Sequence, residues 1–455
     1  MTTHHDLAIL GSGSGNSIPT EQMEDWSIAM VEPDVFGGTC LNRGCIPSKM
    51  FVHAADVAHG ITTAARFNVQ GTYGGVDFAG LRDRVFGRID PIAAGGEAYR
   101  RSQSHVTVYD KPGRFTGPRT ITSGSETFTA DRIVLAAGSR PRIPPIEGIQ
   151  AVPVETSDTI MRLDALPASL TVIGGGAVAA EMAHVFAALG SRVTMLQRGD
   201  RLLTHEEPEI GRALTAAFTE RGIDVRTGVL ALAARQTTSG IELQLSDGSG
   251  VTSDVLLVAA GRISNGDQMD LDAGGVAVDH LHRPIVDRHL RTSAEGVWAL
   301  GDLTGHHQDL KHIANAHATA IRHNLLHPDA PIAPVVPNQP RAVFTDPEVA
   351  SVGLLEAEAI ADGHAICVGT RHYAGSAYGW ALEDTTSFAK VIVDAQSRLV
   401  LGAHIIGPAA SILLQPLVQA MTFGQTADQL ATEMVWPHPA LTEVIEQALL
   451  EAGDD

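Results

Sequence analysis

Two segments of the sequence repeat one pattern, and this pattern constrains the fold more than any other feature. Residues 6–32 read DLAILGSGSGN, then a stretch long enough for a helix, then the strand-like AMVE. Residues 170–198 read LTVIGGGAVAAEMAHVFAALGSRVTMLQR, which indicates a strand, a glycine turn, a long helix and a second strand. Each segment has the length of a βαβ unit, about 30 residues. We therefore predict two nucleotide-binding domains in one α/β chain.

Further short apolar strands end in turn signals, at residues 132–141, 254–265 and 296–302. Such strand ends bring backbone to a ligand at the carboxyl edge of a parallel sheet. Residues 328–340 contain five prolines, too many for a helix or a central strand, so we predict a linker there. The segment after it mixes strands with helices, which indicates a separate C-terminal domain. At 455 residues the chain is long enough for about three domains.

The charge balance and the cysteine content exclude several classes of protein. A formal charge of −20 argues against binding to nucleic acid or to anionic membranes, both of which need a basic surface. No run approaches about 18 consecutive apolar residues, and the N-terminus carries no secretory signal, so we expect a cytoplasmic protein. Three cysteines in such a chain do not make a structural disulfide framework.

The first glycine loop places Gly11 and Gly13 at the first two positions of a G-x-G-x-x-G pattern, but Asn16 takes the third. The early glycines permit a tight turn and let the backbone approach a pyrophosphate at a helix N-terminus. We expect Asn16 to loosen the packing of the helix on the strand. Glu32 follows about 20 residues on, where a carboxylate accepts hydrogen bonds from ribose hydroxyls. The alternative is a glycine-rich turn without a ligand.

The second loop, with Gly174, Gly176 and Ala179, fits the G-x-G-x-x-A form of the motif. The strand after it ends in the sequence LQR and carries no acid; it closes with Arg198, and Arg201 stands close behind. A carboxylate there would repel the 2′-phosphate of NADP, whereas arginine pairs with it. We therefore predict NADPH, with NADH as the weaker cofactor. The alternative is that both arginines are solvated surface charges.

Two of the three cysteines, Cys40 and Cys45, lie in the stretch GGTCLNRGCIPSKM. Their spacing differs from that of a C-x-x-C zinc knuckle, and there is no second pair, so we predict no metal. Five residues of helix rise about 7.5 Å, more than the usual Cα separation of a disulfide, so the segment must bend for a bond to form. Gly44 allows a bend, and Pro47 disfavours helix at Ile46. A bent pair is easily reduced, which favours redox chemistry over the alternative of two free thiols in a helix.

Three further residues fit a flavin beside this pair, through which electrons would pass from NADPH to a substrate disulfide. Lys49 would stabilise negative charge on the flavin ring, with Glu181 as its candidate partner. Asp302 follows a short strand, where it would accept hydrogen bonds from ribityl hydroxyls. The alternatives are ordinary surface residues for Lys49 and Glu181, and a turn or N-cap role for Asp302.

Together, GSGSGN with Glu32, GGTCLNRGCIPSKM, AAGSRP, GGGAVAAE, AAGR, LGD and HPALTE resemble the motifs of the flavin-dependent pyridine nucleotide–disulfide oxidoreductases, the family of glutathione reductase and lipoamide dehydrogenase. The resemblance covers essentially the whole chain. It implies tightly bound FAD and a homodimer. It also implies that Cys40 is the interchange thiol, that Cys45 is the charge-transfer thiol, and that Lys49 and Glu181 pair near flavin N5.

The resemblance also implies how the chain is divided. We expect an FAD-binding domain at residues 1–150, an NAD(P)-binding domain at 151–267, a central segment at 268–337 that completes the FAD domain, and an α+β dimerisation domain at 338–455. The residues implied in cofactor binding are Gly11, Gly13, Glu32, Thr39, Lys49, Gly113, Gly138, Gly174, Gly176, Arg198, Arg201, Gly261 and Asp302.

The C-terminal stretch WPHPALTEVIEQALL contains a candidate acid–base pair. Glu443 follows His438 by five residues at the start of a predicted helix, which suits an imidazole–carboxylate pair. In the family such a pair reaches the active site from the other subunit, where the histidine protonates the leaving thiolate and helps to activate the interchange thiol. The C-terminus carries no further thiol pair of the mercuric reductase kind, and Cys367 is expected to be a buried apolar residue.

Several stretches, most of them outside the cofactor motifs, resemble one branch of the family, the actinobacterial mycothione reductases. They are GSGSGNSI, VFGRIDPIAAGGEAYRR, RAVFTDPEVASVG, SAYGWALEDT and WPHPAL. This resemblance implies that the substrate is mycothiol disulfide (mycothione), reduced to mycothiol; the spacing of residues alone identifies no substrate. The alternatives are lipoamide dehydrogenase or glutathione reductase activity, and a flavoprotein subunit without turnover of its own.

Overall fold

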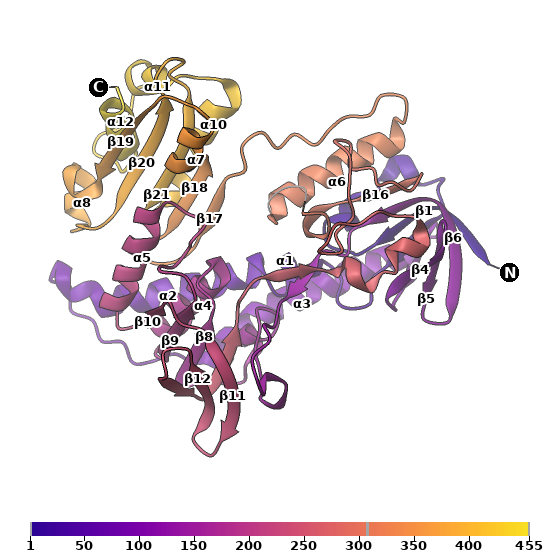
Figure 1. The fold of residues 1–455 in the computed structure, drawn as a ribbon, viewed down its shortest axis with the longest axis horizontal. Coiled ribbons are helices and arrows are strands. Elements are labelled where there is room, and N and C mark those ends of the chain that lie inside the picture. Colours follow the sequence, from indigo (N-terminus) through magenta and orange to yellow (C-terminus); the bar gives the residue numbers. More distant parts are fainter. Residues whose placement is uncertain (1, 306–308, 454–455) are drawn as a thin grey trace.

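The computed structural model describes residues 2–305 and 309–453, which form three main sheets with helices packed against them (Figure 1). The first sheet has the strand order β3-β2-β1-β6-β5-β4, with β16 beside β6. Strands β1, β2, β3, β6 and β16 pair in parallel, and β4 and β5 extend the sheet antiparallel. The bounds are β1 Thr3–Leu10, β2 Ile28–Val31, β3 Val106–Tyr109, β4 Gly113–Gly117, β5 Thr120–Ser123, β6 Glu126–Leu135 and β16 Val297–Ala299.

The second sheet is parallel and has the order β10-β9-β8-β14. Helix α4 connects β8 to β9, helix α5 connects β9 to β10, and an antiparallel meander of β11, β12 and β13 follows. The bounds are β8 Ser169–Ile173, α4 Ala177–Leu189, β9 Arg192–Gln197, α5 Pro208–Glu220, β10 Asp224–Thr227, β11 Ala231–Thr237, β12 Gly240–Leu245, β13 Gly250–Ser253 and β14 Val255–Val258.

Two features join these sheets. Strands β7 (Ser139–Pro141) and β15 (Arg262–Ser264) pair antiparallel between them. A shared apolar core lies where α2 (Cys45–Thr63) and α3 (Phe78–Ser102) meet α4. Within this core the Phe78 ring lies 5.8 Å from that of Phe51 and 5.9 Å from that of Phe186. Because α2 carries Cys45, the core fixes the cysteine segment relative to both nucleotide loops.

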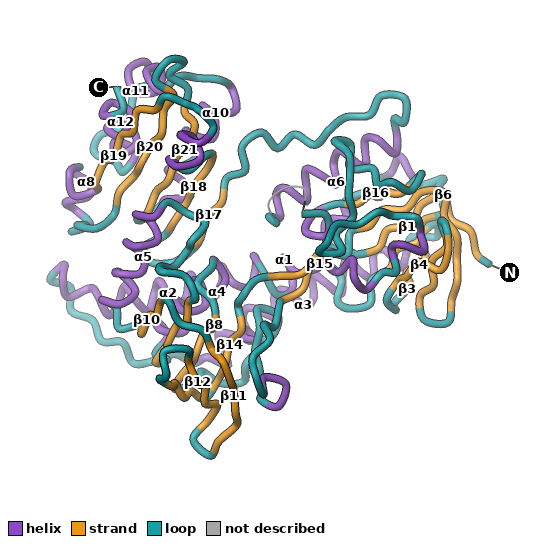
Figure 2. Tube along the Cα trace, viewed as in Figure 1, coloured by secondary structure: helices purple, strands orange, loops and turns teal. Residues whose placement is uncertain are grey.

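The C-terminal part begins after helix α6 (Lys311–Leu326) with the proline-rich segment, which has neither helix nor strand up to residue 340 (Figure 2). Five antiparallel strands follow in the order β17-β18-β21-β20-β19, covered by short helices. The bounds are β17 Arg341–Val343, β18 Val349–Gly353, α7 Glu356–Ala361, β19 Ile366–His372, α8 Ala377–Ala381, β20 Phe388–Asp394, β21 Val400–Ile406, α9 Ala410–Leu413, α10 Gln415–Phe423, α11 Ala427–Glu433 and α12 Thr442–Glu451.

The predicted fold class, two Rossmann-like domains followed by a C-terminal α+β domain, is confirmed. The residue limits of the four expected domains stay predictions. Within the described residues, no helix combines the length and the apolar character that a membrane span needs.

The first βαβ prediction needs one correction. Between β1 and β2 the chain forms two short 3-10 turns, Ser14–Ser17 and Glu21–Met23, in place of an α-helix. Pro19 lies between these turns, and a proline in a helix interior removes a backbone donor and clashes with the preceding turn. The parallel pairing of β1 with β2 is nevertheless made.

Candidate active site

The two cysteines lie on either side of a sharp bend. Helix α1 (Gly38–Asn42) carries Cys40, and α2 begins at Cys45. The backbone leaves the helical conformation at Gly44 (φ −127°, ψ −120°), where a β-carbon would lie 2.9 Å from the carbonyl oxygen of Thr39. A residue larger than glycine would therefore push the two helices apart.

Proline does not interrupt this segment as expected. Ile46 and Pro47 both lie in the first turn of α2, so the expectation of a non-helical Ile46 is wrong. The first amide groups of a helix have no carbonyl partner within it, and a proline there loses no hydrogen bond. The bend lies at Arg43 and Gly44, before the proline.

The side chains of Cys40 and Cys45 meet as two free thiols that form a hydrogen bond with one another. This hydrogen bond shifts their pKa values in opposite directions. It lowers the pKa of Cys45 to about 7, against the effect of burial and with further help from the charge of Lys49. It raises the pKa of Cys40, as burial also does. The pair can therefore hold one thiolate, on Cys45, with the Cys40 thiol donating to it.

The first glycine loop holds the cysteine segment in place through backbone contacts. The amide of Gly37 donates to Ser12 Oγ at 3.0 Å, and a β-carbon on Gly38 would lie 2.7 Å from the Cα of Gly13. The amide and hydroxyl of Ser12 donate to Glu32 Oε2 at 2.9 and 2.7 Å. The predicted residues Gly13 and Glu32 thus lie at one junction with the thiol segment.

Lys49 and Glu181 also come together as expected. Lys49 Nζ lies 2.7 and 2.6 Å from the two carboxylate oxygens of Glu181, which is buried on α4. The backbone amide of Phe344 donates to Glu181 at 3.0 Å, and the Phe344 ring lies 4.4 Å from Lys49 Nζ. Lys49 on α2 is thus held by Glu181 from α4 and by Phe344 from the chain after β17. These contacts fix the position of the lysine one helical turn from Cys45.

Each glycine loop packs against the backbone just after a neighbouring strand of its sheet, which is β6 for the first loop and β14 for the second. A β-carbon on Gly11 would lie 2.3 Å from the carbonyl oxygen of Ala136, and one on Gly174 would lie 2.3 Å from that of Ala259. Both glycines have positive φ values, +113° and +130°. These alanines belong to the AAGSRP and AAGR motifs, so each motif pair forms one close approach of backbone to backbone.

The loop backbones fit the dinucleotides that the sequence predicts. At Gly138, Gly176 and Gly261 a β-carbon would meet no protein atom within 4 Å, so a ligand can approach the backbone directly. In the first loop Gly15 takes over the close packing expected of the third motif position, because its β-carbon would lie 2.9 Å from Ile9 and Ala136. Asn16 therefore does not loosen the loop.

The remaining predicted cofactor residues are placed as follows. Asp302 lies in a 3-10 turn after β16 and accepts from Ser139 Oγ at 2.8 Å. Thr39 is exposed beside Cys40. A β-carbon on Gly113, in β4, would lie 3.1 Å from Val31 and 3.2 Å from Leu10, which is a packing contact within the sheet. Their roles in cofactor binding stay predictions.

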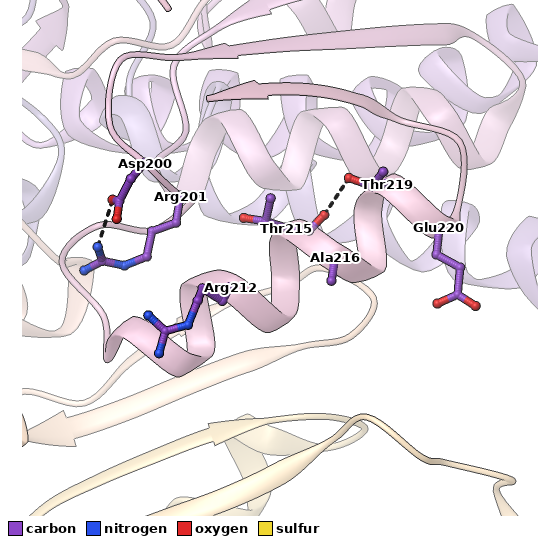
Figure 3. A pocket seen from close by; sticks show the side chains of 7 residues that line it. All are labelled: Asp200, Arg201, Arg212, Thr215, Ala216, Thr219 and Glu220. Atoms are coloured by element: carbon purple, nitrogen blue, oxygen red, sulfur yellow. Dashed lines mark hydrogen bonds and ion pairs between the residues drawn. The ribbon is translucent and has the colours of Figure 1, made fainter. Parts of the chain in front are cut away.

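The two arginines after β9 differ in their surroundings. Arg198 is exposed and forms no ion pair within the described part of the chain. Arg201 Nη1 donates to Asp200 Oδ1 at 2.9 Å, beside an open groove of about 540 Å³ that these two residues line with α5 (Figure 3). Of these two arginines, Arg198 is the one whose charge has no acidic partner among the described residues, so it is the better candidate to bind a 2′-phosphate.

His438 and Glu443 form the expected contact, with His438 Nδ1 2.8 Å from Glu443 Oε1. This hydrogen bond lowers the pKa of Glu443. The imidazole is 71% exposed, and α12, which begins four residues later, lies far from α1 (Figure 1). Within one described chain the histidine therefore does not reach the thiols.

Several residues at the site were not predicted. Ser12 joins Gly37 to Glu32, and Ser14 meets Lys311 at the start of α6. Serines between motif glycines are a signal that could have pointed to them, whereas Lys311 has none because it lies almost 300 residues away. Cys367 is half-buried on β19 and not fully buried as expected. No group of three metal-binding side chains occurs in residues 2–305 and 309–453.

Comparison with known proteins covers almost the whole chain. Residues 5–320 match the family described as pyridine nucleotide-disulphide oxidoreductase, and residues 339–449 match the dimerisation domain of that family. Mycothione reductase of Mycobacterium tuberculosis is 46% identical over 98% of this chain and 99% of its own length.

More distant relatives also match over most of their length. Mercuric reductase of Streptomyces lividans is 35% identical over 97% of this chain and 94% of its own. Dihydrolipoyl dehydrogenase of Haloferax volcanii is 31% identical over 98% of this chain and 96% of its own. Among solved structures, the HOCl-induced flavoprotein disulfide reductase RclA of Escherichia coli superposes with a TM-score of 0.87, at 25% identity over 98% of this chain and 99% of that one.

Proposed function

The chain belongs to the pyridine nucleotide-disulphide oxidoreductase family, and we propose that it uses FAD and NADPH to reduce the low-molecular-weight disulfide mycothione to mycothiol. It is an NAD(P)H-dependent flavoprotein disulfide reductase. The observation that carries the choice of substrate is the 46% identity to a mycothione reductase, which extends over both family segments and 98% of the chain.

The thiol pair carries out the reduction of the substrate disulfide. When bound, FAD would supply the two electrons, taken from the nicotinamide, that convert the disulfide of Cys40 and Cys45 to a dithiol. Cys40 then attacks one sulfur of the substrate disulfide and forms a mixed disulfide, and the first mycothiol leaves as a thiolate. The Cys45 thiolate attacks the Cys40 sulfur, which re-forms the internal disulfide and releases the second mycothiol. Two electrons and two protons are thereby added to the substrate.

The opposite pKa shifts support this division of roles. The lowered pKa of Cys45, about 7, makes its thiolate readily available near neutral pH, while the raised pKa of Cys40 means that Cys40 needs a base to become a nucleophile. We assign that base to His438 of the partner subunit, oriented by Glu443, because within one chain His438 is exposed and remote from the thiols. The same imidazole then protonates the leaving thiolate. The active enzyme is accordingly a homodimer with shared sites.

The preference for NADPH rests on Arg198. The end of β9 carries no carboxylate, and Arg198 is the exposed cation there. Because Arg201 is paired with Asp200, the enzyme should bind the 2′-phosphate with one arginine, and its preference over NADH should be modest.

The deciding experiment measures the oxidation of NADPH by the purified protein with mycothione, glutathione disulfide and lipoamide offered separately. We expect fast turnover with mycothione only, and its loss in Cys40→Ser with FAD still bound. If the protein instead reduced lipoamide but not mycothione, and preferred NADH to NADPH, the chain would be a dihydrolipoyl dehydrogenase. That outcome has a basis in the 31% identity to the Haloferax volcanii enzyme.

A further inference from the structure

The second nucleotide loop leads into a long helix whose N-terminus attracts anions, and the first nucleotide loop does not. After Gly176 the chain enters α4, a helix of 13 residues, whose N-terminus favours a pyrophosphate through its peptide dipoles. After Gly13 it forms only the four-residue turn Ser14–Ser17. So short a turn sums few dipoles and leaves few free amides. The dinucleotide diphosphate at the first loop therefore needs another source of positive charge.

A lysine from a distant part of the chain reaches this loop. Lys311 is the first residue of α6, and its Nζ donates to Ser14 Oγ at 2.9 Å. Ser14 Oγ in turn donates to Asn315 Oδ1 at 3.1 Å, one helical turn further along α6. Lys311 is half-buried, and no carboxylate pairs with it in the part of the chain that the structure describes. An ammonium group placed between a glycine loop and a helix, without an acidic partner, has its charge available for an anion.

We propose that Lys311 binds the diphosphate of the flavin dinucleotide at the first loop and supplies the charge that a helix N-terminus would otherwise provide. The proposal rests on the FAD-dependent part of the proposed function and is independent of which disulfide is reduced. Ser14 and Asn315 hold the ammonium group at the loop, so the charge is positioned before the cofactor arrives.

The same lysine also has a long-range effect on the thiols, since its charge is one of the smaller influences that lower the pKa values of Cys40 and Cys45. The alternative role for Lys311 is that of a cation for the thiols. The two roles differ in which part of the cofactor the lysine recognises, and this difference makes them separable.

The test compares FAD with riboflavin, which lacks the diphosphate. Deflavinated protein is titrated with each ligand, and binding is followed by the quenching of flavin fluorescence, for the native chain, Lys311→Met and Lys311→Arg. A charged hydrogen bond contributes enough for its loss to weaken FAD binding about tenfold or more in Lys311→Met. Riboflavin binding should change less than about twofold, and Lys311→Arg should keep most of the FAD affinity, because it retains the charge.

Arg322→Met is the matched control. Arg322 lies on the same helix and donates to the carbonyl of Ser17 at the far end of the same turn, at 3.4 Å. Its loss should leave FAD affinity unchanged. The loss in Lys311→Met should shrink at high salt, because screening weakens the charge that the native lysine contributes.

Three results would overturn the proposal: equal losses for FAD and riboflavin, a Lys311→Met variant that binds FAD like the native chain, or an equal loss in Arg322→Met. Circular dichroism of each deflavinated protein, and the temperature at which each holoenzyme releases its flavin, separate weak binding from misfolding. If mycothione proves not to be the substrate, these affinities are unaffected, so failure of the substrate assignment and failure of this proposal are distinct.

Discussion

Two thiols on one short segment have different acidities mainly because of the hydrogen bond between them, which raises the pKa of Cys40 and lowers that of Cys45. The Cys40 hydrogen bond and the charge of Lys49 both favour the Cys45 thiolate, and together they outweigh its partial burial. The same hydrogen bond raises the pKa of Cys40. A site built in this way favours the thiolate on Cys45 and keeps Cys40 protonated until a base is available.

This asymmetry predicts a pH profile for alkylation of the reduced enzyme. Modification of Cys45 by iodoacetamide, resolved by peptide mass spectrometry, should have its midpoint near pH 7. Lys49→Met removes a cation that favours the thiolate, so the pKa should rise and the midpoint should move up by about one pH unit or more. Less thiolate is then present at neutral pH, and modification at pH 7 slows.

Lys111→Met is the control for that experiment. Lys111 is 64% exposed and pairs with Asp110, away from the thiols. An unchanged Cys45 midpoint is expected in this variant. If Lys49→Met also left the midpoint at pH 7, the charge of Lys49 would have no part in stabilising the thiolate.

At the level of elements, the two βαβ units reach the same loop geometry in different ways. The second unit uses the long helix α4, with Ala179 fully buried at the third motif position. The first uses Gly15 for the close packing and fastens Asn16 to α3 through Arg100. Arg100 is only 7% exposed; it donates to Asn16 Oδ1 at 2.8 Å and to the Asn16 carbonyl oxygen at 2.6 Å. The missing helix is thus replaced by hydrogen bonds to a neighbouring one.

Arg100→Met should therefore destabilise the first loop more than any neighbouring arginine does. It removes charge-assisted hydrogen bonds and leaves a buried carbonyl group without a partner, at a cost of about 2 kcal/mol. Urea unfolding of the holoenzyme should show this loss, together with easier release of flavin. Arg101→Met, which removes only an exposed ion pair with Glu97, should stay within about 0.5 kcal/mol of the native chain. Equal effects of the two changes would contradict the anchoring role of Arg100.

On the scale of the whole molecule, a buried ion cluster fastens the second sheet to the C-terminal domain. Lys390 on β20 lies 2.8 Å from Glu207, at the start of α5, and 2.5 Å from Glu356 on α7. Lys390 is 4% exposed and Glu207 is 2% exposed. Burial alone would lower the pKa of Lys390, but the hydrogen bonds to the two glutamates hold it above its usual value.

Lys390→Met should accordingly be strongly destabilising, by about 3–5 kcal/mol, because the buried carboxylate of Glu207 loses its counter-charge. Urea titration measures the difference from the native chain. Since the folded pKa of the lysine is raised, its contribution is fully present below the unfolded value of about 10.4 and is lost as the pH rises above it. Combining Lys390→Met with Glu207→Gln should recover part of the stability. If Lys390→Met alone were as stable as the native chain, the ion cluster would not stabilise the contact between the second sheet and the C-terminal domain.

The shared active site makes a prediction that only a dimer can satisfy. Cys40→Ser and His438→Gln should each abolish turnover of the disulfide in homodimers. A heterodimer of the two variants, purified through two different tags, should regain about half of the native activity, because one of its two sites keeps both residues. If the histidine acted within its own chain, neither site would be intact and the heterodimer would be inactive.

Much of the fold followed from local pattern. Continuous apolar strands such as residues 7–10 and 170–173 and the glycine turns after them indicated the two parallel sheets, because strands buried on both faces need such runs. Five prolines marked the linker before the last domain, since proline cannot form helix or central strand. Pro19, between the two 3-10 turns, is the local signal against a helix after β1, since a proline is not compatible with a helix interior.

The sequence by itself determined which side chains carry the chemistry: two cysteines around a glycine, one lysine after them, and a histidine followed by a glutamate. These are local patterns, and their spacing along the chain is enough to recognise them. Only the tertiary structure decided what each one faces. It set Glu181 and Phe344 around Lys49, and it brought Lys311 to Ser14. Such contacts join residues far apart in sequence, and they form only when several elements pack at once.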